Sequence, residues 1–161
     1  MILKNFRINA FTSRKLLGNP ACVVPLKKWL SDEILLKIAK KNNVSETAFF
    51  INENSKFSIR WFTPDIEMDL CGHATLAAAH CINKHLNLNF ETILFNSNIG
   101  KLSVNILNDL YQLDFPKREP IESELPEEIY NSLSILFAFF LGAVNTLFLY
   151  PSILNEQLSL L

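Results

Sequence analysis

The sequence predicts an α+β fold in which a curved, barrel-like and mostly antiparallel sheet wraps around one central buried helix. Two observations predict it. Short segments with the β-branched and aromatic residues of strands recur between polar turns. Residues 72–86 are dominated by alanine, leucine and isoleucine over most of a helical circumference, which is typical of a helix surrounded by protein.

The N-terminal part of the chain is expected to supply two strands and a helix. Residues 2–11 are rich in large apolar groups that partly alternate, which predicts a strand leading into a turn at 18–20, with a short strand over 21–25. Ser31 precedes two acidic residues and predicts a helix start, since a hydroxyl can cap free amides and carboxylates favour the positive end of the helix dipole. The basic and amide residues at 40–43 predict where that helix ends.

The middle of the chain is expected to form a hairpin. Residues 46–51 and 57–62 have strand composition and are separated by the polar turn 52–55. Residues 65–70 alternate acidic with apolar groups, which predicts a further strand with one wet face.

Three more strands are expected after the buried helix. The segments 92–95, 101–107 and 110–115 have strand composition, and Asn108-Asp109 suits a tight turn between the last two.

Composition excludes several classes of protein. Fifteen basic residues nearly cancel sixteen acidic ones, so no net field holds a polyanion, and nucleic-acid binding is not expected. The first residues lack the pattern of a secretion signal, which makes the cytoplasm the expected location. Cys22, Cys71 and Cys81 have no paired spacing and are expected to be thiols.

The C-terminal part of the sequence differs from the rest. No Lys or Arg follows Arg118, and residues 133–150 are apolar over a length that can span a bilayer, roughly 17–25 residues. Three interpretations stay open: a premature end or frameshift, a membrane helix, or a segment that packs on an otherwise exposed apolar face. Asn145 within the segment and the missing basic flank weaken the membrane interpretation.

Glu46 is the first candidate for chemistry. It follows the predicted helix and stands at the mouth of an apolar strand, where a carboxylate loses part of its water. Desolvation disfavours the ionised form, which is how a glutamate becomes able to give and take protons near neutrality. The alternative is an exposed loop glutamate between Ser45 and Thr47.

The second candidate is the turn at 70–75, which joins a strand to the start of the buried helix. Free amides and the helix dipole make such a start an anion site that a substrate carboxylate would fit. Gly72 allows a close backbone approach, and His73 adds a group that titrates near neutral pH. The alternative is a plain turn followed by a first-turn histidine.

Cysteine and metal chemistry have weaker support in the sequence. Cys71 could be a thiolate beside the helix terminus, as in racemases that use two cysteines, but only Cys22 and Cys81 could supply the second thiol, and Cys81 is expected to be a packing residue. No metal is expected, because the possible zinc ligands lack a recognised ligand spacing; they are His73, His80, Cys81 and His85.

Four ordered motifs carry a family resemblance. They are Ala10–Ser13 with Gly18–Ala21, then 45–49, then 60–64, then 70–75. Together they resemble the PhzF-like family of phenazine-biosynthesis type isomerases, over residues 1–118.

The resemblance implies a diaminopimelate-epimerase-like fold, in which two similar halves each wrap a sheet around a helix and the substrate binds between them. It implies that Glu46 is the general acid/base that moves a proton on a small anionic acid, without metal or organic cofactor. It also implies that Asn19, Gly72 and His73 contact the substrate and that Cys71 takes no part.

Residues 1–118 are therefore expected to be the N-terminal domain, and 119–161 a linker and apolar tail. The family's second half supplies an aspartate and a glycine-rich turn that this sequence lacks, so we expect an incomplete isomerase. The alternatives are a non-catalytic remnant that dimerises or binds a small anion, and a protein tethered to a membrane by residues 133–150.

Overall fold

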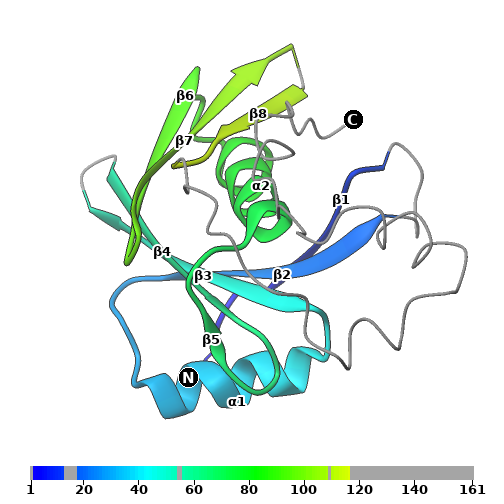
Figure 1. Cartoon of the computed structure of the whole chain (residues 1–161), viewed down its shortest axis with the longest axis vertical. Helices are drawn as coiled ribbons and strands as arrows, with labels where there is room; N and C mark the ends of the chain where they lie inside the picture. The colour runs from blue at the N-terminus through cyan, green and yellow to red at the C-terminus, as the bar shows by residue number, and fades with distance from the viewer. Residues whose placement is uncertain (1, 13–17, 54–55, 109, 117–161) are drawn as a thin grey trace, which may run out of the picture. The chain divides into compact units, whose positions relative to one another are not determined.

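The structure, a computed structural model, describes residues 2–12, 18–53, 56–108 and 110–116 of the chain (Figure 1). These residues form one mixed sheet and three helical segments. The elements are β1 (Phe6–Ala10), β2 (Asn19–Leu26), α1 (Asp32–Asn42), β3 (Glu46–Glu53), β4 (Lys56–Phe62), β5 (Glu67–Met68), α2 (Gly72–His80), the π-helical turn η1 (Cys81–His85), β6 (Thr92–Ser97), β7 (Gly100–Leu107) and β8 (Leu110–Asp114).

The strands follow one another across the sheet in the order β1-β2-β3-β4-β6-β7-β8, and β5 pairs with β4 beside this path. The β2–β3 and β4–β6 pairs are parallel, and the other pairs are antiparallel. The mostly antiparallel sheet expected from the sequence is therefore confirmed. The parallel β2–β3 pair aligns Ala21 with Glu46, which matters for the site.

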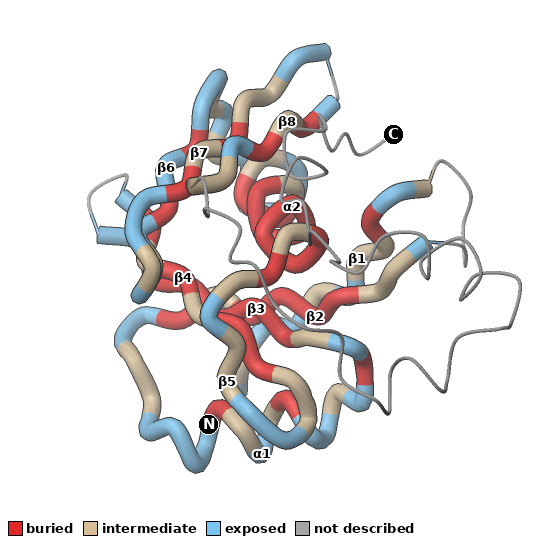
Figure 2. Tube along the Cα trace, in the orientation of Figure 1, coloured by how far each residue is buried: buried red, intermediate tan, exposed pale blue. Residues whose placement is uncertain are grey.

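Helix α2 lies in the hollow of the curved sheet and is buried along its length (Figure 2). Leu76 and Ala77 have no exposed surface, and the helix packs against β1, β2, β3 and β8. Small alanine side chains let the backbone of the helix approach the strands closely. The central buried helix is confirmed.

Helix α1 covers the opposite face of the sheet. Leu35 and Ala39 pack against a second apolar cluster that includes Val24 and Phe49. Strand β3 is therefore buried on both faces, with Phe49 towards α1 and Phe50 in the cluster around α2. This explains its nearly continuous apolar sequence.

Beside α1, Arg60 of β4 holds two neighbouring segments together. Its guanidinium donates to the Glu67 carboxylate at 2.7 Å and to Asp32 at 2.8 Å. These hydrogen bonds raise the pKa of Arg60, so it stays charged throughout the ordinary pH range.

Two boundaries in the first part of the chain differ from expectation. Asn19 and Pro20 belong to β2 and pair with β1, and of the three residues of the expected turn Gly18 alone lies outside the strand, with φ of 87°. Ser31 precedes α1, but its side chain makes no cap; the first-turn amide of Ile34 donates to the Ser31 backbone carbonyl at 2.9 Å.

The strand expected at 65–70 is almost entirely replaced by a loop. The Thr63 hydroxyl accepts from the amides of Asp65 and Ile66, and this tight turn leaves only the two residues of β5 to pair with β4. The expected helix over 72–86 changes to π geometry at Cys81.

The expectations for residues 119–161, including the apolar stretch 133–150, lie outside the described residues. In the ranges that are described, no helix has the length and apolar character needed to cross a membrane. The hairpins expected around 52–55 and 108–109 agree with the antiparallel β3–β4 and β7–β8 pairs.

Candidate active site

Glu46 lies at the start of β3, on the face of the sheet that carries α2. Alternate side chains of a strand share a face, and the next two on the Glu46 side, Ala48 and Phe50, belong to the cluster around α2. Asn43, in the left-handed conformation, ends α1 and turns the chain back into this strand. The Glu46 side chain keeps 18% of its surface exposed, so it is partly dehydrated yet reachable.

His73, in the first turn of α2, meets Glu46. Its Nε2 lies 3.2 Å from Oε2 of Glu46, and the histidine side chain is 9% exposed. Both atoms are buried, and neither has a hydrogen-bond partner of ordinary geometry in the described part of the chain, so the two lie in contact without an aligned hydrogen bond between them. A buried polar pair of this kind is available to a polar group of a ligand.

Burial sets the charge state of His73. It lowers the pKa of the imidazole, and the Glu46 carboxylate and the backbone carbonyl of Pro20 act against that shift. The ring is therefore uncharged at neutral pH, and its contact with Glu46 joins a neutral imidazole to a carboxylate.

Cys71, at the N-cap of α2, contacts the other edge of the histidine ring. Its Sγ lies 3.3 Å from Nδ1 of His73. Burial raises the pKa of the Cys71 thiol to about 12, the Ala74 backbone N–H acts against this, and the Glu46 charge adds to it. At neutral pH Cys71 is a protonated thiol, which does not suit the thiolate that a two-cysteine racemase needs.

Cys81 and Cys22 offer no second thiol at this place. Cys81 is completely buried, and burial raises its pKa to about 12. Cys22 belongs to the outer face, near Asn5 and Arg7. All three cysteines are free thiols, as expected.

Glu46, Cys71 and His73 each offer a ligand-type atom, and these atoms lie within 4.8 Å of one another. They form a chain through the ring, with sulfur at Nδ1 and carboxylate at Nε2. Of the other possible zinc ligands, His80 and His85 contact each other, with 5.7 Å between the centroids of their rings.

Asn19 and Gly72 border the pair. The Asn19 side-chain oxygen accepts from the Ser45 hydroxyl at 2.9 Å, immediately before Glu46. Gly72 is the first residue of α2. The structure thus brings all four predicted site residues to one region where β2, β3 and α2 begin.

Comparison with known proteins tests the resemblance. The sequence pattern of the PhzC-PhzF family, described as phenazine biosynthesis-like proteins, matches residues 8–133. The chain belongs to the phenazine biosynthesis-like family. The resemblance drawn from the four motifs is therefore confirmed.

Members of this family resemble the chain in sequence and in structure. An uncharacterized isomerase of Pseudomonas aeruginosa is 42% identical over 135 residues, which make up 84% of this chain and 52% of that protein. The crystal structure of a PhzF-family phenazine biosynthesis protein from Enterococcus faecalis has a TM-score of 0.73 at 40% identity and covers 83% of this chain and 51% of that one. The chain spans about half the length of these relatives.

The fold extends to more distant proteins. A predicted epimerase of Pseudomonas aeruginosa has a TM-score of 0.64 at 18% identity, over 80% of this chain and 48% of that one. At this identity only the fold is shared. The epimerase-like half-barrel expected from the family resemblance is confirmed.

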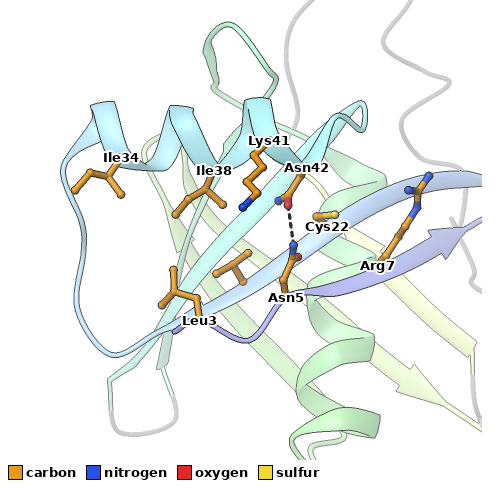
Figure 3. A pocket seen from close by; sticks show the side chains of 9 residues that line it. Leu3, Asn5, Arg7, Cys22, Ile34, Ile38, Lys41 and Asn42 are labelled. Carbon is orange, nitrogen blue, oxygen red and sulfur yellow. Dashed lines mark hydrogen bonds between the residues drawn. The ribbon is translucent and has the colours of Figure 1, made fainter. Parts of the chain in front are cut away.

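A groove of about 560 Å³ lies on the opposite face of the sheet, between α1 and the first two strands (Figure 3). The Asn5 side chain donates to Asn42 across it at 2.7 Å. None of the predicted site residues lines this groove. It is therefore separate from the Glu46–His73 pair of this family member.

Proposed function

We propose that this chain is the N-terminal part of an isomerase that moves a proton at carbon on a small carboxylic acid. The observation that supports it is the Glu46–His73 pair at the start of α2, with 3.2 Å between Oε2 and Nε2. The isomerase name of the Pseudomonas aeruginosa relative points to the same class of reaction.

In this proposal Glu46 is the general acid/base. Its carboxylate takes a proton from one carbon of the substrate and returns it to the same or a neighbouring carbon. A partly dehydrated carboxylate does this well, because water does not compete for the proton and less solvent must reorganise. No metal or organic cofactor takes part.

The start of α2 would hold the anionic group of the substrate. The first amides of a helix lack intrahelical partners and carry the positive end of its dipole. The Thr75 amide already donates to the Cys71 carbonyl at 3.1 Å. The amides of Gly72 and His73 are the proposed anion donors, with the Asn19 side chain at the edge of the substrate.

The groups that face Glu46 across the substrate would lie outside this half-barrel. Because the chain spans about half the length of its relatives, groups opposite Glu46 would come from sequence beyond this half-barrel or from a second copy in a homodimer. The expected location is the cytoplasm, and the expected partner is a small anionic organic acid. A second candidate, anion binding without turnover, follows from the same half-length coverage.

The test is solvent deuterium exchange. The chain is incubated in deuterium oxide with a panel of amino acids and unsaturated cyclic carboxylic acids, and incorporation at carbon is followed by proton NMR. We expect exchange with the wild type and at least about a hundredfold less with Glu46→Gln, since general acid–base catalysis contributes about 10²–10⁴-fold.

Glu53→Gln is the matched control, because Glu53 is an exposed carboxylate at the other end of the same strand. It should exchange at the wild-type rate. Equal rates for the wild type and Glu46→Gln would contradict the proposal. Binding of the acids without exchange by any variant would favour the second candidate.

A further inference from the structure

Cys71 has no part in the proposed proton transfer, yet its sulfur lies 3.3 Å from Nδ1 of His73. The side chain is buried and sits at the N-cap of α2, two residues before the histidine. Its backbone is fixed as well, because the Cys71 carbonyl accepts from the amide and hydroxyl of Thr75 at 3.1 and 2.6 Å. The sulfur is therefore held at one edge of the ring.

The neighbours of the sulfur decide the direction of its hydrogen bond. It accepts from the backbone N–H of Ala74, and burial keeps the group protonated at neutral pH. The thiol hydrogen then needs an acceptor. Within the described residues, Nδ1 of His73 is the side-chain atom that lies at hydrogen-bonding distance from the sulfur.

The other polar neighbours of the ring are acceptors. The Glu46 carboxylate lies at Nε2, and the backbone carbonyl of Pro20 also favours a protonated ring. In a neutral imidazole one nitrogen donates and the other accepts, and the neighbours decide which. An unprotonated Nε2 would place a lone pair 3.2 Å from the carboxylate oxygen, and the two negative groups would repel each other.

We propose that Cys71 is a positioning residue whose thiol donates to Nδ1 of His73, placing the ring proton on Nε2, the nitrogen beside Glu46. The result is a continuous series of contacts from sulfur through the ring to the carboxylate. It keeps Oε2 of Glu46 beside the ring and leaves Oε1 for the substrate. The value of this arrangement to the reaction rests on the proposed function of Glu46, but the tautomer itself does not.

The test is two-bond ¹H–¹⁵N correlation NMR on the whole chain with labelled histidine. For wild-type His73 at neutral pH we expect a pyrrole-type Nε2 that carries the proton and a pyridine-type Nδ1 that accepts a hydrogen bond. Cys71→Ala should move the Nδ1 resonance towards that of a free pyridine-type nitrogen. Cys71→Ser, which keeps a donor, should restore most of the wild-type position.

Cys81→Ala is the matched control, because it also removes a buried thiol, and burial alone accounts for the raised pKa of that thiol. It should leave the His73 resonances unchanged. A wild-type proton on Nδ1, or an Nδ1 resonance that Cys71→Ala does not move, would overturn the proposal. Since the wild-type spectrum alone shows the tautomer and whether Nδ1 accepts a hydrogen bond, a proton on Nδ1 or an Nδ1 without a hydrogen bond overturns the proposal even where a variant fails to fold.

These spectra need no substrate, so they are independent of the deuterium-exchange result. A proton on Nε2 and an Nδ1 resonance that moves in Cys71→Ala, together with no Glu46-dependent exchange, would reject the proposed function and keep the role of Cys71 as the residue that orients His73. Glu46-dependent exchange together with a ring proton on Nδ1 would keep the proposed function and reject the proposed role of Cys71.

Discussion

Glu46 and His73 come from different elements, and each takes its character from what surrounds it. Glu46 keeps about a fifth of its surface because it stands at the end of a strand, while His73 loses nearly all of its surface in the first turn of α2. A neutral ring beside a carboxylate can pass or hold a proton without a buried charge pair having to form. The pair is therefore suited to acid–base chemistry.

The burial of His73 predicts how stability depends on pH. Its pKa is lowered in the folded state from an unfolded value near 6.5. As pH falls below that value, the unfolded chain binds a proton that the folded chain does not, so the free energy of unfolding falls. His73→Gln, which cannot titrate, should show a shallower loss of stability between about pH 7 and pH 5 in urea unfolding. Parallel profiles for the two proteins would show that His73 is not responsible.

Single residues of the site could be predicted from the sequence where their local setting is distinctive. Glu46 is an acid between a predicted helix and the mouth of an apolar strand, and His73 follows a glycine at the start of an apolar helix. The contact of Cys71 with the His73 ring was missed, although the two residues are nearly adjacent, because it depends on side-chain directions at the N-cap. The role of Pro20 was missed because its carbonyl approaches His73 only through the fold.

At the scale of elements, the parallel β2–β3 pair determines the site. Helix α1 connects the two strands, and their register sets Ala21 beside Glu46, so that Asn19 reaches Ser45. The composition of a strand predicts that it is a strand, but not which partner it takes or whether the pair is parallel. Strand existence was therefore predictable from the sequence, whereas this pairing was not.

Gly18 immediately precedes β2 and has a backbone conformation that favours glycine. It has φ of 87°, and a Cβ there would lie 2.2 Å from the carbonyl oxygen of Ala10. We expect Gly18→Ala to lower the free energy of unfolding by more than about 1–2 kcal/mol, the usual cost of a left-handed backbone for a residue with a Cβ, since the clash adds to it. Urea unfolding measures the change.

Gly100→Ala separates the clash from the backbone effect. Gly100 also has positive φ, 122°, but no atom lies within 4 Å of an added Cβ. Its substitution should cost clearly less than Gly18→Ala. Equal losses for the two variants would show that the close approach to Ala10 is relieved by a small shift of the chain.

Other element boundaries show where local patterns were overridden. The acidic and apolar alternation at 65–70 has the period of a strand, but the Thr63 turn uses the backbone groups that a longer strand would need. The hydroxyl of Ser31 was expected to cap α1, but the amide of Ile34 in the first turn donates to the Ser31 backbone carbonyl. Local hydrogen bonds of side chains and backbone therefore decide these boundaries more than the residue pattern does.

At the scale of the whole molecule, one half-barrel encloses one helix, and that architecture follows from composition. Helix α2 is apolar on all sides and must be surrounded, and the strands before and after it supply the wall. The chain covers about half the length of its relatives from Pseudomonas aeruginosa and Enterococcus faecalis. In the proposed function, the Glu46–His73 pair at the start of the enclosed helix is what this half-barrel would contribute to the site.

The proposed site requires Glu46 and His73 to lie side by side in solution. The most direct measurement is the nuclear Overhauser effect between the γ-methylene protons of Glu46 and the carbon-bound ring protons of His73, in selectively labelled chain. With Nε2 and Oε2 3.2 Å apart, we predict a clear cross-peak at neutral pH. Its absence, with the signals of both side chains assigned and sharp, would contradict the account.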